Sequence, residues 1–211
     1  VKPEAVTMIN GRVLDERDSL PLGAKIIYKD LATNKIIGEA YSDSATGAFQ
    51  LVLPYKSLYS IYAQTANYYP KRDTINMVYL NQYATKEKDL FLQKMDVGQP
   101  IRLNNIFFET GDAALLNSSF DELENLLSIL TVNQSIYIAI NGYTDNVGNK
   151  SDNLVLSKAR AKSVMDYLIE KGISTDRLSH EGFGEANPLN DNSTPELQQA
   201  NRRVEFVITK M

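Results

Sequence analysis

One acidic and one basic residue, fifteen positions apart, have the types and the spacing to bind a charged ligand. Asp145 lies in the loop-like segment 142–149, and Arg160 lies in the amphipathic segment that follows it. At 100° per residue, Arg160 falls between Leu156 and Val164 on the apolar stripe of a predicted helix. A guanidinium on an inner face is costly unless it is paired and hydrogen-bonded. The sequence therefore predicts that Arg160 meets a carboxylate.

Two interpretations of this pair remain open from spacing alone. In the first, Asp145 and Arg160 bridge each other and fix the loop to the helix. In the second, each residue pairs with a group from outside: the carboxylate binds an ammonium, and the guanidinium holds a carboxylate in its fork. An α-amino-acid head group has that shape and charge pattern. Gly148 and Asn149 in the loop tolerate the backbone angles that a tight pocket requires.

The elements that must position this pair belong to the second half of the chain. Helical spacing predicts helices over 117–130 and 153–171, and alternation or β-branched residues predict the strands. The order β-α-β-α-β predicts an α+β two-layer domain with helices on one face of a mixed sheet. Residues 188–200 are polar and are expected to form a loop with some helix. The strands are expected at 101–108, 135–141, 177–184 and 203–209.

The first half of the chain has a different pattern. Short segments rich in β-branched and aromatic residues alternate with turn signals and show no helical period, which predicts a small antiparallel all-β sandwich. We expect a linker at 93–100, and hence domains at 1–95 and 96–211. The predicted strands of the first domain are 8–14, 24–28, 36–41, 49–53 and 59–63.

Composition excludes several classes of function. The 211 residues are 43% apolar and 23% charged, with a formal charge of −4 and no cysteine. An acidic chain is not favoured to bind nucleic acid, and without cysteine there is no disulfide, thiolate metal site or cysteine nucleophile. No apolar run is long enough to cross a bilayer. Because the chain starts at Val1 without a signal pattern, we expect a mature or excised fragment, with any targeting signal outside it.

An enzymatic function has little support in the sequence. The single histidine, His180, lies in a strand-like segment, where a structural role is the more common one. No cluster of metal ligands appears, and the glycines of Gly182 and Gly184 lack the context of a nucleotide loop. An aspartate beside a guanidinium stays ionised, which suits Asp145 to holding a cation better than to moving protons. We expect no catalytic residue, no metal and no cofactor.

Four motifs in the second half resemble the peptidoglycan-binding OmpA-like domain. Their order and spacing over roughly residues 98–210 are more specific than any one of them alone. Two positions depart from the family's pattern: Tyr143 stands where a histidine is usual, and Leu197-Gln198 stands where Gly-Arg is usual. The motifs are GYTDNVG at 142–148, NLVLSKARA at 153–161, GFGE at 182–185 with Pro188, and NRRVE at 201–205.

The resemblance implies a module that binds the stem peptide of peptidoglycan non-covalently, through the zwitterionic end of meso-diaminopimelate. By correspondence with the family's motifs, Asp145 and Arg160 hold that end. The departure at Tyr143 puts a ligand contact from that position in doubt. The supporting contacts correspond to Thr110, Thr144, Asn153 and Arg202.

The first half resembles a carboxypeptidase-regulatory-like, transthyretin-like domain, on the motifs NGRVLD at 10–15, PLGA at 21–24 and YSIYA at 59–63. Such domains lack catalytic residues and act as spacers or docking modules. The pair of domains resembles the C-terminal part of envelope proteins of the Bacteroidota, including a component of type IX secretion. This implies a periplasmic location, outer-membrane association through regions outside the fragment, and envelope or secretion-system proteins as further partners. Docking through the first domain is the alternative function.

Overall fold

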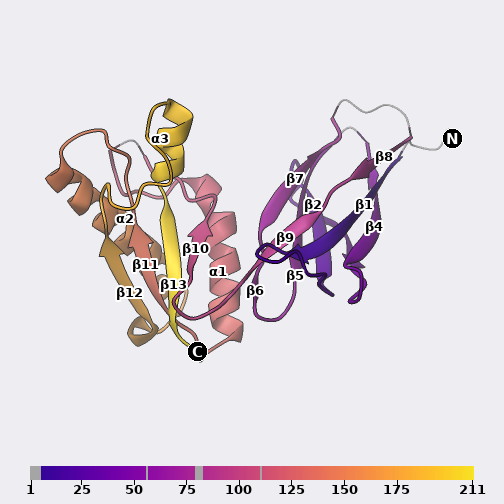
Figure 1. The fold of residues 1–211 in the computed structure, drawn as a ribbon, viewed down its shortest axis with the longest axis horizontal. Helices are drawn as coiled ribbons and strands as arrows, with labels where there is room; N and C mark the ends of the chain where they lie inside the picture. Colours follow the sequence, from indigo (N-terminus) through magenta and orange to yellow (C-terminus); the bar gives the residue numbers. More distant parts are fainter. Residues whose placement is uncertain (1–5, 56, 79–82, 110) are drawn as a thin grey trace. The chain divides into compact units, whose positions relative to one another are not determined.

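The computed structural model describes residues 6–55, 57–78, 83–109 and 111–211 (Figure 1). The chain divides into two compact units, Val1–Met95 and Asp96–Met211. Among the described residues, no helix is both long and apolar enough to cross a membrane.

Unit 1 is built from strands arranged in two sheets, and each of the five predicted segments overlaps one of these strands. The expectation of a purely antiparallel arrangement was wrong, because β1 pairs in parallel with both β8 and β9. One sheet has the order β4-β1-β9-β6, with β8 also paired to β1, and the other has the order β3-β2-β5-β7. The strands are β1 (Val6–Asp15), β2 (Lys25–Asp30), β3 (Ile36–Tyr41), β4 (Ala48–Pro54), β5 (Leu58–Gln64), β6 (Tyr68–Tyr69), β7 (Arg72–Asn76), β8 (Ala84–Glu87) and β9 (Leu90–Lys94).

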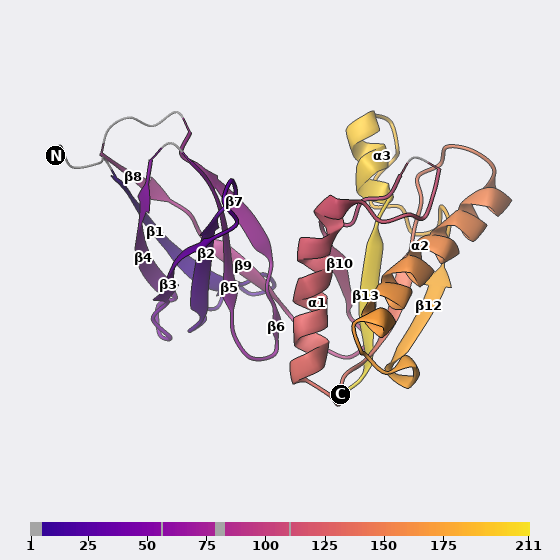
Figure 2. The ribbon, with the colours of Figure 1, turned by 180° about the vertical axis from the view of Figure 1, so that it is seen from behind.

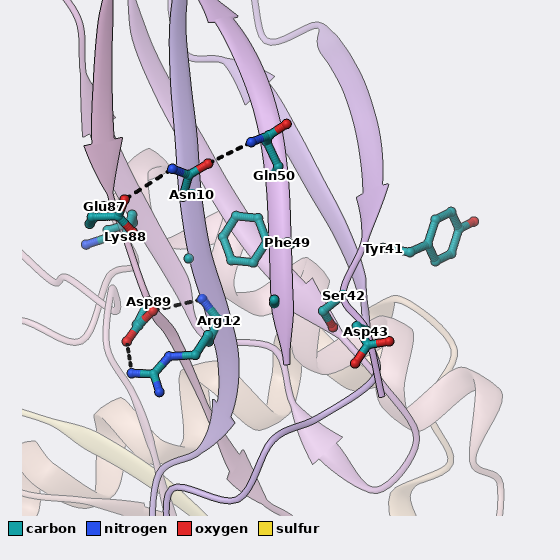
Figure 3. Close-up of a pocket in the computed structure, with 12 residues that line it drawn as sticks. Asn10, Arg12, Tyr41, Ser42, Asp43, Phe49, Gln50, Glu87, Lys88 and Asp89 are labelled. Atoms are coloured by element: carbon teal, nitrogen blue, oxygen red, sulfur yellow. Dashed lines mark hydrogen bonds and ion pairs between the residues drawn. The ribbon is translucent and has the colours of Figure 1, made fainter. Parts of the chain in front are cut away.

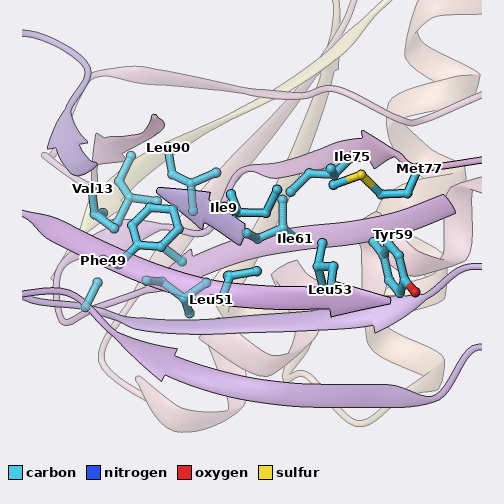
Figure 4. Close-up of a cluster of buried hydrophobic side chains, with 14 residues drawn as sticks. Ile9, Val13, Phe49, Leu51, Leu53, Tyr59, Ile61, Ile75, Met77 and Leu90 are labelled. Atoms are coloured by element: carbon cyan, nitrogen blue, oxygen red, sulfur yellow. The ribbon is translucent and has the colours of Figure 1, made fainter. Parts of the chain in front are cut away.

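The core of unit 1 lies between the two sheets (Figure 4). Period-two alternation makes this possible: Phe49, Leu51 and Leu53 of β4 are buried, whereas Gln50 and Val52 between them are exposed. Strands of the second sheet contribute buried side chains to the same cluster. They include Ile26, Tyr59, Ile61 and Ile75.

Unit 2 is a mixed sheet with its two long helices on one face (Figure 2). The sheet order is β10-β13-β11-β12; β12 is parallel to β11, and the other neighbours are antiparallel. This confirms the expected mixed α/β fold of the second half. The elements are β10 (Pro100–Leu103), α1 (Phe120–Val132), β11 (Tyr137–Gly142), α2 (Lys150–Glu170), β12 (Leu178–Gly182), α3 (Pro195–Asn201) and β13 (Val204–Lys210), with short 3₁₀ turns at Asn117–Ser119 and Thr175–Arg177.

Two segments of unit 2 differ from the sequence-based expectation. The strand predicted over 101–108 ends at Leu103, and Phe108 forms only an isolated bridge with Leu115. The segment 188–200, expected as a loop with some helix, contains α3, whose start is capped by the Thr194 side chain accepting from the Leu197 amide at 3.3 Å. The segment after β10 and helix α3 both lie at the end of the sheet where β11 ends and β13 begins (Figure 1).

Candidate ligand-binding site

Helix α2 lies directly against the sheet because two strand-end glycines leave room for its backbone. A Cβ atom at Gly142 would lie 2.1 Å from the Ser157 carbonyl oxygen, and one at Gly182 would lie 2.3 Å from the Lys158 amide nitrogen. Only glycine permits this approach. The contact fixes the N-terminal half of α2, which carries Arg160, beside the end of β11, from which Asp145 follows.

A cavity of about 480 Å³ opens at this end of unit 2. Its walls come from the loop before α1, the loop after β11, the first turns of α2 and the region of α3. The cavity therefore gathers segments that are far apart in the sequence. The lining residues are Phe108, Glu109, Gly111, Thr144, Asp145, Val147, Asn153, Leu156, Arg160, Gln198, Gln199 and Arg202.

Arg160 is buried, as its position on the apolar stripe predicts, with 6% of its surface exposed. Its Nε donates to the backbone oxygen of Asp112 at 2.9 Å, and its guanidinium carbon lies 4.9 Å from the centre of the Phe108 ring. Among the described residues, neither terminal nitrogen has a hydrogen-bond partner or an ion pair. Burial, followed by the charge of Arg202, lowers the pKa of Arg160 from 12.5, although an arginine remains protonated in proteins. The side chain thus presents an unmatched guanidinium fork.

Asp145 does not pair with Arg160. Its Oδ2 is paired with Nη1 of Arg202, and its Oδ1 accepts from the Val147 amide at 3.1 Å. Arg202 also donates through Nη2 to the side chain of Gln199 on α3. Of the two interpretations left open by the sequence, the internal Asp145–Arg160 bridge is therefore not formed among the described residues. Asp145 still lines the same cavity as Arg160.

Asn153 organises the loop that carries Asp145. Its Nδ2 donates to the Val147 carbonyl at 3.1 Å and to Glu185 Oε1 at 2.9 Å, and it lies 3.5 Å from the carbonyl oxygen of Asp145. One turn further along α2, the Ser157 hydroxyl accepts from the Gly184 amide at 2.9 Å. These bonds tie the loops after β11 and β12 to the first turns of α2, so the backbone around Asp145 is held from two sides.

The remaining predicted site residues have different surroundings. Thr144 is buried and lines the cavity; its amide donates to the Gly184 carbonyl at 2.8 Å, and its hydroxyl has no partner among the described residues. Thr110 lies outside the described residues. Tyr143 is not among the lining residues: its ring stacks on Phe183, with centroids 5.3 Å apart, and the guanidinium of Arg203 lies 3.8 Å from its centroid.

Several contributors to the site are not apparent from sequence reasoning. Glu185 belongs to the GFGE motif, but its partnership with Asn153 spans 32 positions and requires the fold. Gln199 holds Arg202 from α3, a helix only loosely expected from the sequence. The Asp112 contact uses a backbone oxygen, which any residue type supplies, so no sequence signal exists for it.

Charged side chains of both signs line the cavity. The lining holds two carboxylates, Glu109 and Asp145, and two guanidinium groups, Arg160 and Arg202; Glu109 is exposed, whereas Asp145 and Arg160 are buried. Across the part of the chain that the structure describes, no group of three histidine, aspartate or glutamate residues is placed to hold a metal ion. A buried, unmatched guanidinium next to an acidic group suits a ligand that carries a carboxylate.

A second hollow, on unit 1, has polar groups that already satisfy one another (Figure 3). Asn10 bridges two neighbours, donating to Glu87 at 3.2 Å and accepting from Gln50 at 3.0 Å. Arg12 is paired with Asp89 at 2.9 Å. This surface therefore leaves no comparable unmatched charge for a ligand.

Comparison with known proteins finds similarity in the second unit. Residues 107–202 match the OmpA family. Peptidoglycan-binding protein ArfA of Mycobacterium tuberculosis (strain ATCC 25618 / H37Rv) is 39% identical over 103 residues, covering 49% of this chain and 32% of that protein. Probable lipoprotein YiaD of Escherichia coli (strain K12) is 34% identical over 108 residues, covering 51% of this chain and 49% of that protein. The chain thus spans about a third to a half of the length of these relatives.

Among solved structures, a putative MotB-like protein from Desulfovibrio vulgaris is 32% identical, with a TM-score of 0.45, over 49% of this chain and 67% of that chain. The family match covers both motif regions that line the cavity, around Asp145 and around Arg160. The likeness to the OmpA family is therefore limited to residues 107–202, within the second unit.

Proposed function

We propose that unit 2 binds peptidoglycan non-covalently, through the zwitterionic end of diaminopimelate in the stem peptide. Arg160 grips the free carboxylate, and Asp145 receives the free ammonium. The observation that carries this proposal is the guanidinium of Arg160, which is buried in the cavity wall without an ion pair among the described residues. A buried charge of this kind calls for a ligand carboxylate.

The geometry of the cavity supports this assignment. Because Nε of Arg160 is bound to the Asp112 carbonyl, the side chain is oriented before a ligand arrives, and its two terminal nitrogens remain for a bidentate contact. Asp145 lines the same cavity, so one head group can reach both residues. The name of the relative ArfA, a peptidoglycan-binding protein, agrees with this role. The proposed role is that of a binding module, not of an enzyme.

The wider proposal is that the protein anchors an assembly of the cell envelope to the wall, in the periplasm and associated with the outer membrane. Unit 1, with its two sheets around a common core, is proposed to be a carboxypeptidase-regulatory-like sandwich that serves as spacer or docking module. We propose that this architecture resembles that of PorE, a peptidoglycan-linked component of type IX secretion. Supporting contacts to the ligand are proposed for Thr110, Thr144 and Asn153.

Sedimentation with purified sacculi tests the proposed binding. The full chain and the variants Asp145→Ala, Arg160→Ala and Lys158→Ala are compared, where Lys158 is an exposed cation on the same helix as Arg160. Each shielded charged contact contributes about 1.5–3 kcal/mol, so losing one should weaken affinity roughly ten- to a hundredfold. The Lys158 variant should bind like the parent chain. If the folded Asp145 and Arg160 variants still sediment as the parent does, the site is wrongly assigned.

A further inference from the structure

The two arginines of the cavity differ in how firmly they are held. Arg160 is buried and is fixed by the Asp112 carbonyl and the Phe108 ring. Arg202 follows the short helix α3, and 35% of its side chain is exposed, against 9% for its partner Asp145. Because Arg202 is already partly hydrated, solvent weakens its ion pair with Asp145, and this pair can open at a small cost in free energy.

Both oxygens of the Asp145 carboxylate already have a donor. Oδ1 accepts from the Val147 amide, and Oδ2 is occupied by Arg202. The Val147 bond belongs to the loop and stays with it. A carboxylate oxygen can accept two hydrogen bonds, but a ligand ammonium that shared Oδ2 with the guanidinium of Arg202 would meet a like charge, so the two cations compete for Asp145. A ligand carboxylate meets no such competition at Arg160, whose terminal nitrogens have no partner among the described residues.

We propose that Arg202 is a displaceable internal counter-ion, which occupies the ammonium position on Asp145 and sets the class of ligand that the cavity selects. A plain carboxylate binds at Arg160 and leaves the Asp145–Arg202 pair closed. A zwitterionic head group exchanges its ammonium for the guanidinium of Arg202. The inference rests on the proposed function, but it gives Arg202 a role opposite to that of a supporting ligand contact.

This exchange makes a specific prediction for Arg202→Gln. Without the guanidinium, Asp145 is available, so the affinity for a zwitterion should rise by about three- to tenfold, as expected for the loss of a partly exposed competing ion pair. A ligand that lacks the ammonium gains nothing from a free Asp145. Its affinity should stay within about a factor of two or fall slightly, because one positive charge is lost from the cavity.

The test uses meso-diaminopimelic acid and its N,N′-diacetyl derivative as probes, titrated against the full chain and followed by NMR chemical shifts. The variants are Arg202→Gln, Arg160→Gln and, as the matched loss of a cation on α2, Lys158→Gln. Support requires that Arg202→Gln binds the free diamine more tightly and increases its preference over the diacetyl form. Lys158→Gln should leave both affinities and their ratio unchanged.

Three other results would overturn the inference, and only the last of them would also overturn the proposed function. If Arg202→Gln weakens both probes while the parent chain still depends on Arg160, then Arg202 contacts the ligand directly; the inference is overturned and the proposed function stands. An unchanged preference between the probes overturns it as well. If neither probe binds the parent chain or any variant, the proposed function falls together with the inference.

Discussion

The carboxylate of Asp145 is paired with the guanidinium of Arg202, which lies 57 positions further along the chain. Arg160 lines the same cavity and has no ion pair among the described residues. Of the two arginines that line the cavity, only Arg202 is thus paired with Asp145 among the described residues. The proposed binding of a ligand carboxylate rests on Arg160, because its unpaired guanidinium has already lost most of its hydration.

Replacing Arg160 by methionine should separate stability from binding. The change removes a buried cation without an ion pair among the described residues and loses one hydrogen bond, to the Asp112 carbonyl. We expect the free energy of unfolding of unit 2 to stay equal or to rise by about 1–2 kcal/mol, while sedimentation with sacculi is lost. Urea denaturation of the full chain measures the first quantity.

The control for this variant is Arg177→Met. The guanidinium of Arg177 donates to the carbonyl oxygens of Ile136, Leu130 and Asn133. Arg177 thus has hydrogen-bond partners at Nε and at a terminal nitrogen, whereas Arg160 has one at Nε alone among the described residues. Its loss should destabilise unit 2 by about 1–3 kcal/mol without changing the cavity. If Arg160→Met destabilises the unit as much as Arg177→Met does, then Arg160 is a structural arginine and not a poised binding group.

The hydrogen bond between Asn153 and Glu185 should contribute to affinity through the loop that carries Asp145. Asn153→Ala releases the Val147 carbonyl and Glu185 together, whereas Glu185→Gln keeps the shape and removes the charge of one partner. We expect weaker binding to sacculi for both variants, larger for Asn153→Ala. In the double-mutant cycle with Glu185→Ala, the coupling energy should be about 1 kcal/mol. Strictly additive effects would show that the two residues act independently.

Gly142→Ala should force α2 away from the sheet, because the added Cβ would lie 2.1 Å from the Ser157 carbonyl oxygen. Backbone atoms cannot yield as a flexible side chain does, so we expect a loss of about 1–3 kcal/mol in the stability of unit 2 and weaker binding. Gly98→Ala is the comparison: Gly98 has a positive φ of 82° but open space around it. Gly98→Ala should lower the stability of unit 2 by about 1 kcal/mol, and this variant should still bind sacculi. Equal losses of binding in both variants would contradict the steric argument.

The sequence predicts the parts of this site that depend on local periodicity. The burial of Arg160 follows from its place between Leu156 and Val164, and the structure confirms it. The Asp145–Arg202 pair could not be predicted this way, because it depends on how α3 and the loop after β11 meet at the end of the sheet. The resemblance named both residues but did not indicate that they bind each other.

In the fold, too, local sequence patterns predict some features and not those that depend on contacts between distant segments. Alternation along β4 predicts a strand with one buried face, and it does so correctly at Phe49 and Leu51. The parallel pairing of β1 with β8 and β9 joins segments about 75 positions apart, for which alternation carries no information. Alternation also fails to predict that β10 ends at Leu103: Ile106 is buried beyond the strand, and Phe108 lines the cavity.

Unit 1 contains a hydrogen bond whose effect on stability should depend on pH. The Tyr68 hydroxyl, on β6, donates to Asp15 Oδ2, on β1, at 2.7 Å. Burial and this bond raise the pKa of Tyr68 to about 12. For Asp15, burial acts to raise the pKa, but the bonds from Tyr68 and from the Arg17 amide outweigh it and leave the pKa below 3.8. The folded state therefore favours a protonated Tyr68 and an ionised Asp15.

The sign of the pH dependence follows from these shifts. A raised tyrosine pKa gives stability that is fully present below pH 10, the ordinary value, and is lost as the pH rises from 10 to about 12. A lowered Asp15 pKa gives stability that is present above pH 3.8 and is lost as the pH falls through its folded value. Tyr68→Phe should lower the free energy of unfolding by about 1–2 kcal/mol at neutral pH. It should also make this free energy depend less on pH in both the acidic and the alkaline range.

Urea denaturation of the full chain across the pH range measures this effect against Tyr83→Phe, a tyrosine of the same unit that is 65% exposed. The Tyr83 variant should follow the parent curve at every pH. Tyr68→Phe should lie below the parent curve at neutral pH and converge with it above about pH 12, because the parent has then lost the proton that the bond requires. A constant difference between the two curves from pH 7 to pH 12 would mean that the Tyr68 hydroxyl stabilises unit 1 by packing and not through Asp15.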